Sequence, residues 1–369
     1  MRRIVQNLQE SRIREVANAG LGRSDVLPFW FGESDEVTPD FIRRAAIESL
    51  ERGETFYSHN LGLPELREAI ATYMSARHPV VTPDRLAVTS GGVHALMLAV
   101  QSLVDAGDEV VAVTPVWPNL VAQPEIMGAR VRCVSLKPVN GAWVLDMDAL
   151  LEAVTSSTRL LIVNSPNNPT GWTLSRDEQV RIAAHCRQTG TWILADEVYE
   201  RLYYEPSDNA CAPSFLDVCS PQDRLIVVNS FSKSFLMTGW RLGWLVLPAA
   251  LTPQIGKLIE FNTSCAPVFA ARRDRGAGAH AGGHARYRGP PEALPRHLDA
   301  AAAGRTRCRI GRRARWHVCV FPACRCRRFV GHGQAPGIGG RPGVGPGRGL
   351  RRQRWRSERQ LVALVLCVA

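Results

Sequence analysis

One lysine, Lys233, lies in the segment NSFSKSFLMTGWRLGW (residues 229–244), directly after the apolar run RLIVVNS. It is one of only three lysines in a chain that has 42 arginines. A lysine amine in a turn after a strand can form a Schiff base with an aldehyde, and a buried, charge-rich site can lower its pKa for that reaction. Ser230 and Arg241 stand three residues before Lys233 and eight residues after it. Taken singly, Lys233 could be a surface lysine and Arg241 a structural arginine, but their joint spacing favours a chemical site.

Three further segments place polar residues where apolar runs end. Ser90, Gly91 and Gly92 stand where RLAVTS opens into the helical pattern GGVHALMLAVQSLV, so unpaired N–H groups and the helix dipole would face an anion. Asp196 follows the buried run TWILA, where a carboxylate without a partner is costly. Asn168 lies in NSPNNPTG, whose prolines constrain the turn. Each segment alone also fits an ordinary turn or core position.

The elements that must position these residues alternate along the first 268 residues. Helical spacing of apolar residues is clear at 39–53, 63–77 and 91–104, and short, nearly continuous apolar runs lie between and after them. Strands that are apolar throughout are buried on both faces, as in a mainly parallel sheet covered by helices. Functional residues in such folds gather at the carboxyl ends of the strands. We therefore expect an α/β fold with a three-layer α/β/α large domain and a mainly parallel sheet.

Together these motifs resemble those of class I/II aminotransferases, which are fold type I pyridoxal-phosphate enzymes of the aspartate aminotransferase superfamily. The family's lysine motif, S-x-S/A-K followed after seven intervening residues by R-x-G, is filled by Ser230, Ser232, Lys233, Arg241 and Gly243. The resemblance implies that Lys233 holds the pyridoxal 5'-phosphate aldehyde as a Schiff base and then moves the proton at the substrate's α-carbon. It also implies that Ser230 and Arg241 hold the cofactor phosphate, for which the planar guanidinium is well suited.

The same resemblance implies roles around the cofactor ring. Asp196 would keep the pyridine nitrogen protonated, so that the ring acts as an electron sink. Tyr199, in LADEVYERLYY, and Asn168 would hydrogen-bond the ring oxygen, and Asn168 would also lie at the substrate. Trp117, in TPVWPNL, corresponds to the family's aromatic residue that stacks on the ring. The glycine-rich segment that begins at Ser90 would face the phosphate.

Two upstream motifs extend the resemblance. FWFGESD is similar to the family's x-G-E-P-D segment, which implies that Gly32 contacts the substrate carboxylate, although Ser34 replaces the usual proline. FYSHNLGLPELREAIA contains Tyr57, which the resemblance assigns to the phosphate of the neighbouring subunit's cofactor. A homodimer with shared active sites is therefore expected.

The resemblance predicts an aminotransferase that moves an amino group between an amino acid and a 2-oxo acid by a ping-pong route. A carbon–sulfur β-lyase of the same fold remains an alternative. So does an inactive scaffold whose basic tail binds nucleic acid. The choice of amino acid and 2-oxo acid is not readable, because side-chain pockets of this fold draw on several distant segments.

The last hundred residues differ in character from the rest. Residues 269–369 carry 22 arginines, no lysine and four acidic residues, whereas residues 1–268 carry 23 basic and 30 acidic residues. The family's small C-terminal domain is not recognisable there, and neither Arg354 nor Arg356 has flanking residues that mark it as a substrate-carboxylate arginine. Two explanations stay open, a disordered basic tail and a slipped reading frame, which the missing lysine favours. The predicted domains are an N-terminal segment (1–40), a cofactor-binding large domain (41–268) and this basic region (269–369).

The sequence also gives expectations about cellular location and metal binding. The start MRRIVQNLQESRIRE lacks the apolar stretch of a secretory signal, and no apolar run reaches the length of a membrane helix, so a cytoplasmic location is expected. Cys308, His317, Cys319, Cys324 and Cys326 fit no common zinc spacing, so no metal site is assigned.

Overall fold

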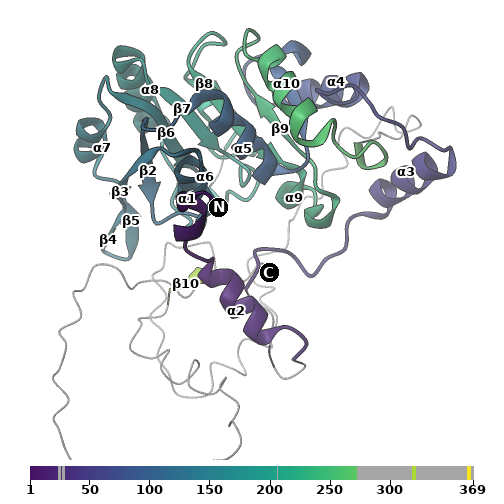
Figure 1. Ribbon diagram of the computed structural model, residues 1–369, viewed down its shortest axis with the longest axis horizontal. Helices are drawn as coiled ribbons and strands as arrows, with labels where there is room; N and C mark the ends of the chain where they lie inside the picture. The colour runs from purple at the N-terminus through teal and green to yellow at the C-terminus, as the bar shows by residue number, and fades with distance from the viewer. Residues whose placement is uncertain (24–25, 27–29, 206, 272–317, 321–363, 367–369) are drawn as a thin grey trace, which may run out of the picture. The chain divides into compact units, whose positions relative to one another are not determined.

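The computed structural model describes residues 1–23, 26, 30–205, 207–271, 318–320 and 364–366. The chain divides into two compact units, one with Met1–Gln9 and Glu33–Trp316 and the other with Glu10–Gly32 and His317–Val368. Among the described residues, none of the helices combines the length and the apolar character needed to cross a bilayer. The first unit contains a seven-stranded sheet with its helices (Figure 1).

The α-helices of the described residues have the following bounds: α1 Arg3–Asn7, α2 Arg12–Gly20, α3 Asp40–Glu51, α4 Pro64–Ser75, α5 Gly92–Leu103, α6 Asn119–Met127, α7 Met147–Ala153, α8 Arg176–Thr189, α9 Phe231–Ser234 and α10 Thr252–Thr263. Short 3-10 helices are η1 Pro83–Arg85, η2 Phe215–Asp217, η3 Thr238–Trp240 and η4 Phe269–Ala271. Of these elements, α2 belongs to the second unit.

The strands of the large sheet are β1 Leu86–Thr89, β2 Glu109–Thr114, β3 Arg130–Ser135, β6 Thr158–Asn164, β7 Trp192–Asp196, β8 Leu225–Ser230 and β9 Gly243–Val246. Their order is β1-β9-β8-β7-β6-β2-β3. Every neighbouring pair is parallel except the two that involve β9. A separate hairpin pairs β4 Lys137–Val139 with β5 Ala142–Val144, and β10 Val318–Val320 pairs with β11 Leu364–Leu366 in the second unit.

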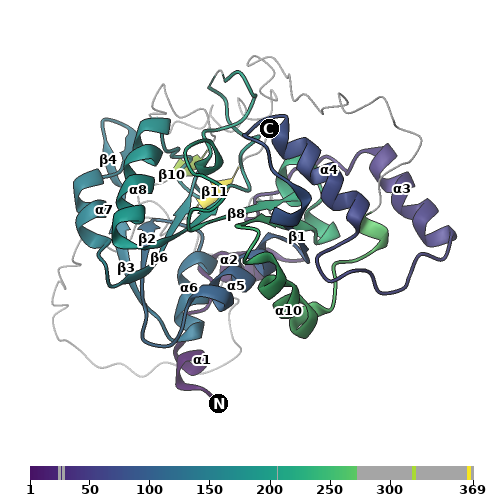
Figure 2. The same ribbon diagram turned by 90° about the horizontal axis from the view of Figure 1, so that it is seen from above.

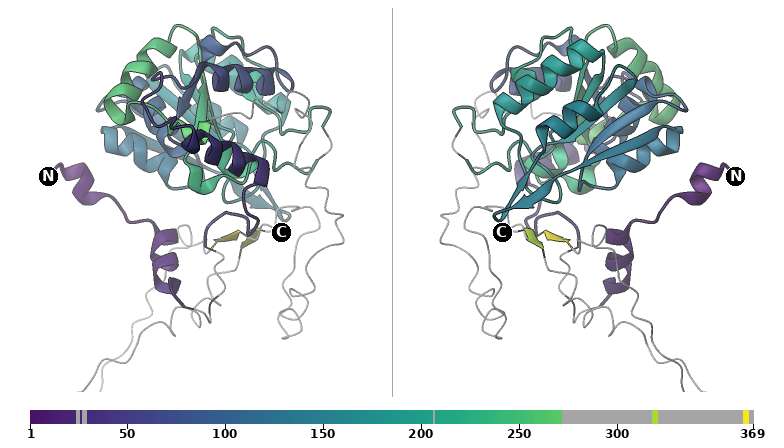
Figure 3. Two further views of the ribbon diagram at one scale, coloured as in Figure 1. Left: turned by 90° about the vertical axis from the view of Figure 1, so that its right-hand side faces the viewer. Right: turned by 90° about the vertical axis from the view of Figure 1, so that its left-hand side faces the viewer.

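The sheet is buried on both faces because its strands alternate between two apolar clusters. In β2, Val111 and Val113 belong to one cluster, while Val110 and Ala112 belong to the other. Helices α4, α7 and α8 contribute buried side chains to the first cluster, and α5, α6 and α10 contribute to the second. Figures 2 and 3 show these two groups of helices on opposite faces of the strands. The predicted three-layer α/β/α domain with a mainly parallel sheet is confirmed.

Local sequence signals explain where the covering helices begin and end. Helix α8 starts at a capping box, in which Ser175 and Glu178 each bond the other's backbone N–H. It ends at Gly190, whose φ of 75° is the left-handed conformation that glycine adopts without strain. The prediction about the small C-terminal domain falls mostly on residues outside the described ranges, and the predicted domain boundaries stay predictions.

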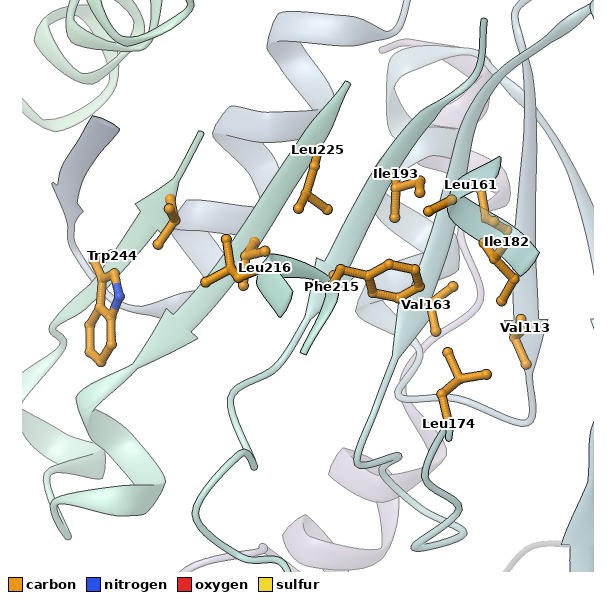
Figure 4. Close-up of a cluster of buried hydrophobic side chains, with 14 of the residues drawn as sticks. Val113, Leu161, Val163, Leu174, Ile182, Ile193, Phe215, Leu216, Leu225 and Trp244 are labelled. Carbon is orange, nitrogen blue, oxygen red and sulfur yellow. The ribbon is translucent and has the colours of Figure 1, made fainter. Parts of the chain in front are cut away.

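Phe215 of η2 belongs to the first apolar cluster and is 1% exposed (Figure 4). Figure 4 shows its ring directed along the face of the sheet toward Val163. Because replacement by alanine removes buried surface and leaves a cavity, we expect Phe215→Ala to lower the free energy of unfolding by about 3–5 kcal/mol in urea titrations. Phe261→Ala is the matched control, because Phe261 is 84% exposed, and it should change stability by less than ~0.5 kcal/mol. Equal losses for the two variants would contradict the assignment of the core.

Candidate active site

The site residues meet at one edge of the sheet because the strands that carry them end there. Asn164 at the end of β6 pairs with Asp196 at the end of β7. Strand β8 ends beside them at Ser230. The antiparallel strand β9 starts at this same edge, where Gly243 pairs with both Ser230 and Thr89, the last residue of β1. The turns after β1, β6, β7 and β8 and the turn before β9 therefore converge.

Lys233 lies in the short helix α9, three residues after the end of β8. The Ser230 side chain begins this helix by accepting a hydrogen bond from the Ser232 nitrogen at 3.1 Å, and its hydroxyl donates to the Leu242 carbonyl oxygen at 3.2 Å. The Lys233 Nζ atom lies 5.9 Å from the centre of the Tyr199 ring. Burial lowers the pKa of Lys233 below its ordinary value, which favours the neutral, nucleophilic amine.

Gly91, Gly92 and Gly243 lie close together at the N-terminus of α5, and we call this group the glycine cradle. Gly91 has φ +95°, and a Cβ added to it would lie 2.5 Å from the Arg241 Nη2 atom. A Cβ added at Gly92 would lie 3.3 Å from that of Ser230. At Gly243 it would lie 2.9 Å from backbone atoms of both Gly91 and Gly92. Side chains at these positions would collide with these atoms, so the glycines let the Arg241 guanidinium and the Ser230 hydroxyl lie close to the α5 N-terminus, a combination suited to a phosphate.

A second group of side chains lies next to Lys233. The Asn168 Nδ2 atom donates to the Tyr199 hydroxyl at 3.1 Å, and the Trp117 backbone nitrogen donates to the Asn168 carbonyl oxygen at 2.8 Å. Asp196 is only 2% exposed and lies close enough to Lys233 for each to shift the other's pKa. Burial also raises the pKa of Tyr199 above its ordinary value, so its hydroxyl is neutral and remains a hydrogen-bond donor.

The arrangement fits the group that the sequence motifs imply, pyridoxal 5'-phosphate. Within the described residues, the one hydrogen bond to the Asp196 carboxylate comes from the Val198 nitrogen at 3.3 Å. Burial raises the pKa of Asp196 to about 7, and that hydrogen bond and Lys233 offset the rise only in part. A buried acid with so little compensation suits a cationic partner such as a protonated ring nitrogen. The glycine cradle would bind the phosphate end of the cofactor, and the Lys233 amine would bind its aldehyde end.

The raised pKa of Asp196 has a measurable effect on the cofactor-free protein. An unfolded aspartate loses its proton near pH 4, whereas folded Asp196 keeps it up to about pH 7. The folded state binds more protons in this window, so stability falls as pH rises, by up to roughly 1.4 kcal/mol per pH unit. We expect urea titrations at pH 5 and pH 7 to show this fall in the wild type and a smaller fall in Asp196→Asn. Glu197, whose pKa burial raises to about 8, contributes equally to both proteins. The same fall in wild type and in Asp196→Asn would contradict the raised pKa of Asp196.

Two residues near the site were not predicted. The His94 Nδ1 atom accepts a hydrogen bond from the Ser90 nitrogen at 3.2 Å, and burial lowers the pKa of His94, which keeps it a neutral acceptor. Glu33 accepts a hydrogen bond from the Thr238 hydroxyl at 3.1 Å, and its charge raises the pKa of Lys233 against the effect of burial. His94 stands one helical turn after Ser90, and this spacing could have been used to predict the hydrogen bond between them.

Other predicted residues are not brought into this group. Tyr57 lies in the connection between α3 and α4 and is 87% exposed. Gly32 belongs to the second unit, whereas the site residues belong to the first. Arg354, Arg356 and most of the tail cysteines fall outside the described residues.

Comparison with known proteins defines the family. The profile of aminotransferase class I and II matches residues 25–274. The chain is 36% identical over 247 residues to a probable aspartate/prephenate aminotransferase of Aquifex aeolicus, covering 67% of this chain and 62% of that protein. It is 34% identical to an aspartate aminotransferase of Pyrococcus horikoshii, covering 68% of this chain and 63% of the relative. These matches cover less than two thirds of the relatives' own lengths.

Solved structures agree with the sequence relatives. The structure of aspartate aminotransferase from Thermus thermophilus with maleate aligns with a TM-score of 0.68 and 33% identity, over 73% of this chain and 70% of that one. Aspartate aminotransferase from Thermotoga maritima aligns with a TM-score of 0.68 and 32% identity, over 73% and 72%. The chain belongs to the class I and II aminotransferase family, as its motifs predicted. Members of this family are generally dependent on pyridoxal phosphate.

Proposed function

We propose that this chain binds pyridoxal 5'-phosphate at the edge of the sheet described above and transfers an amino group between an amino acid and a 2-oxo acid. The phosphate would lie in the glycine cradle, held by backbone N–H groups at the start of α5 together with Ser230 and Arg241. The observation that carries the proposal is the convergence of this cradle with Lys233 and the buried Asp196. An anion site, an amine of lowered pKa and a buried acid are the three features that this cofactor needs.

Each remaining side chain has a defined task in this proposal. Asp196 would hold a proton on the ring nitrogen, and Tyr199 and Asn168, already joined by a hydrogen bond, would bind the ring oxygen. Trp117 would lie against the ring. When bound, pyridoxal phosphate supplies an electron sink for the substrate's α-carbon.

Lys233 would perform two steps in succession. Its neutral amine would attach the cofactor aldehyde, and after the substrate amine displaces it the same Nζ atom would take and return the proton at the α-carbon. Burial supports both steps, because it lowers the pKa of Lys233 toward the range in which a base works near neutral pH. Tyr199, whose ring centre lies 5.9 Å from Nζ, would help to hold the amine above the reacting carbon.

The substrate side is proposed from the relatives and the exposed residues. Several relatives are named aspartate aminotransferases, so aspartate is the first amino donor to test. Gly32 and Asn168 would contact the substrate. Tyr57, which is 87% exposed in the single chain, would reach the cofactor phosphate of a second copy in a homodimer. The large domain that carries this chemistry is proposed to span residues 41–268.

Isotope transfer tests this function directly. The chain is loaded with pyridoxal phosphate and incubated with 15N-labelled aspartate and a panel of 2-oxo acids, and the products are analysed by mass spectrometry. Transfer of the label into a new amino acid is the expected result. Labelled ammonia without a labelled amino acid would indicate a lyase instead, and no label transfer from cofactor-loaded protein would refute the proposed activity.

A further inference from the structure

A second cluster of polar side chains lies in the first unit, behind the segment that carries Asp196 and Tyr199. His78 follows α4, Glu200 is the next residue after Tyr199, and Cys211 lies in the connection that leads to η2. They are 6%, 3% and 1% exposed. One ligand atom from each, the His78 nitrogen, a Glu200 oxygen and the Cys211 sulfur, lies within 4.8 Å of the other two.

Two of these atoms lack a hydrogen-bond partner although they are buried. The His78 Nε2 atom and the Glu200 Oε2 atom face each other at 3.8 Å, a separation too long for a hydrogen bond. A buried polar atom that remains unpartnered costs about 1–3 kcal/mol, so such a pair calls for an explanation. Without a metal, a protonated His78 forms an ion pair with Glu200, and a cation between the two atoms would take the place of that proton.

The other polar atom of each of these two side chains, His78 Nδ1 and Glu200 Oε1, already has a hydrogen-bond partner. The His78 Nδ1 atom lies 2.9 Å from the Asp217 Oδ1 atom, and the Tyr73 hydroxyl donates to the Glu200 Oε1 atom at 2.8 Å. Histidines that bind zinc through one nitrogen commonly donate the other N–H to a carboxylate, which fixes the tautomer and the ring orientation. When its Nδ1 atom donates to Asp217, His78 has Nε2, which lies 3.8 Å from Glu200 Oε2, as its metal-binding nitrogen.

One backbone hydrogen bond and two hydrogen bonds of the Asn209 side chain hold the contributing segments together. The Ala212 nitrogen donates to the Glu200 carbonyl oxygen at 2.9 Å, and the Asn209 side chain joins the loop to the α4 end by donating to the Arg77 carbonyl oxygen at 2.9 Å. Asn209 also accepts from the Cys211 nitrogen at 3.2 Å. These hydrogen bonds link the three segments that carry the metal-binding side chains.

We propose that His78, Glu200 and Cys211 bind a Zn²⁺ ion as its three protein ligands, with a water molecule in the fourth position. Nitrogen, oxygen and sulfur donors are the set that zinc accepts, and a carboxylate with a thiolate neutralises both of its charges. In a tetrahedral zinc site these donors lie roughly 3.3–3.6 Å apart, whereas here they lie within 4.8 Å of one another, so the longest separation would have to shorten by up to about 1.5 Å. The ion would anchor the segment that presents Tyr199 to the proposed cofactor. His78 and Cys211 are 133 positions apart in the sequence, so no short spacing motif marks the site.

Zinc content of matched variants tests the site. Full-length wild type, Cys211→Ser and Cys186→Ser are loaded with Zn²⁺, freed of loosely bound metal with a weak chelator, and analysed by elemental mass spectrometry. Cys186 is the control because it is equally buried, at 3% exposed, and lies outside the cluster. The tail cysteines are present in all three proteins. We expect Cys211→Ser to hold one zinc per chain fewer than wild type and Cys186→Ser to hold the same amount. Equal zinc in wild type and Cys211→Ser, or an equal loss in Cys186→Ser, would overturn the proposal.

A measurement on the wild type alone covers the case in which Cys211→Ser does not fold. Alkylation of each cysteine is followed by peptide mass spectrometry in mild denaturant, with Zn²⁺ or with a strong chelator. A bound ion should slow the alkylation of Cys211 relative to Cys186 by roughly tenfold or more, because ligand binding suppresses opening of its site. The same rate ratio with zinc and with chelator would refute the site.

Discussion

Lys233→Ala is expected to lower the rate of amino transfer by ~10³-fold or more, because it removes the group that would both attach the cofactor and move the α-proton. The fold should survive, since the Lys233 side chain belongs to neither apolar cluster. The rate is measured with the 15N assay under single-turnover conditions, so that cofactor loading can be verified in each sample. A loss confined to cofactor affinity, with an unchanged rate at saturation, would contradict the proton-transfer role.

Two further lysine variants make this result specific. Lys257→Ala removes an exposed lysine of α10 and should leave the rate unchanged. Lys233→Arg keeps a positive charge at the site but cannot form the covalent bond, so its rate should be as low as that of Lys233→Ala. Substantial activity in Lys233→Arg would show that charge alone suffices.

Gly243→Ala is expected to lower the free energy of unfolding by about 3 kcal/mol and to abolish phosphate binding in the cradle. A Cβ at this position would lie 2.9 Å from the Asn229 oxygen and at the same distance from backbone atoms of Gly91 and Gly92. All three contacts are backbone, so β9 can accept the methyl group only by moving away from β8 or from the start of α5. Urea titrations and binding of pyridoxal phosphate, followed by absorbance, measure the two effects.

Gly239→Ala is the matched control for this experiment. Its added Cβ has no atom within 4 Å, and Gly239 is not among the glycines with positive φ. It lies in η3, four residues before Gly243, so it tests whether any methyl group in this connection is harmful. Stability and binding should stay close to wild type. Equal damage from both substitutions would contradict the close-approach argument.

The sheet was largely predictable, and the parts that were not have a physical reason. Strands β2, β6, β7 and β8 are buried on both faces and therefore appear in the sequence as continuous apolar runs. The edge strand β3 was missed because most of its side chains face solvent, and its sequence RVRCVS has two arginines. The antiparallel direction of β9 could not be read either, because burial on both faces gives the same pattern in either direction.

The candidate site was predictable where a motif is short and unpredictable where distance along the chain is large. The lysine segment and the glycines after β1 each occupy a few consecutive residues, and their convergence follows from strand ends meeting at one edge. The cluster of His78, Glu200 and Cys211 depends on side chains that are brought together only by tertiary packing. The roles of Tyr57 and Gly32 depend on a second copy or on the other unit, so they stay predictions.

Reduction of the cofactor-loaded chain with borohydride, followed by peptide mass spectrometry, identifies the amine that holds the cofactor aldehyde. The full sequence contains only Lys137, Lys233 and Lys257 as lysine amines, so the position of a reduced pyridoxyl group is unambiguous. We expect one adduct per chain on the peptide that contains Lys233. An adduct on Lys137 or Lys257 in place of Lys233, or none on protein that retains the cofactor, would contradict it.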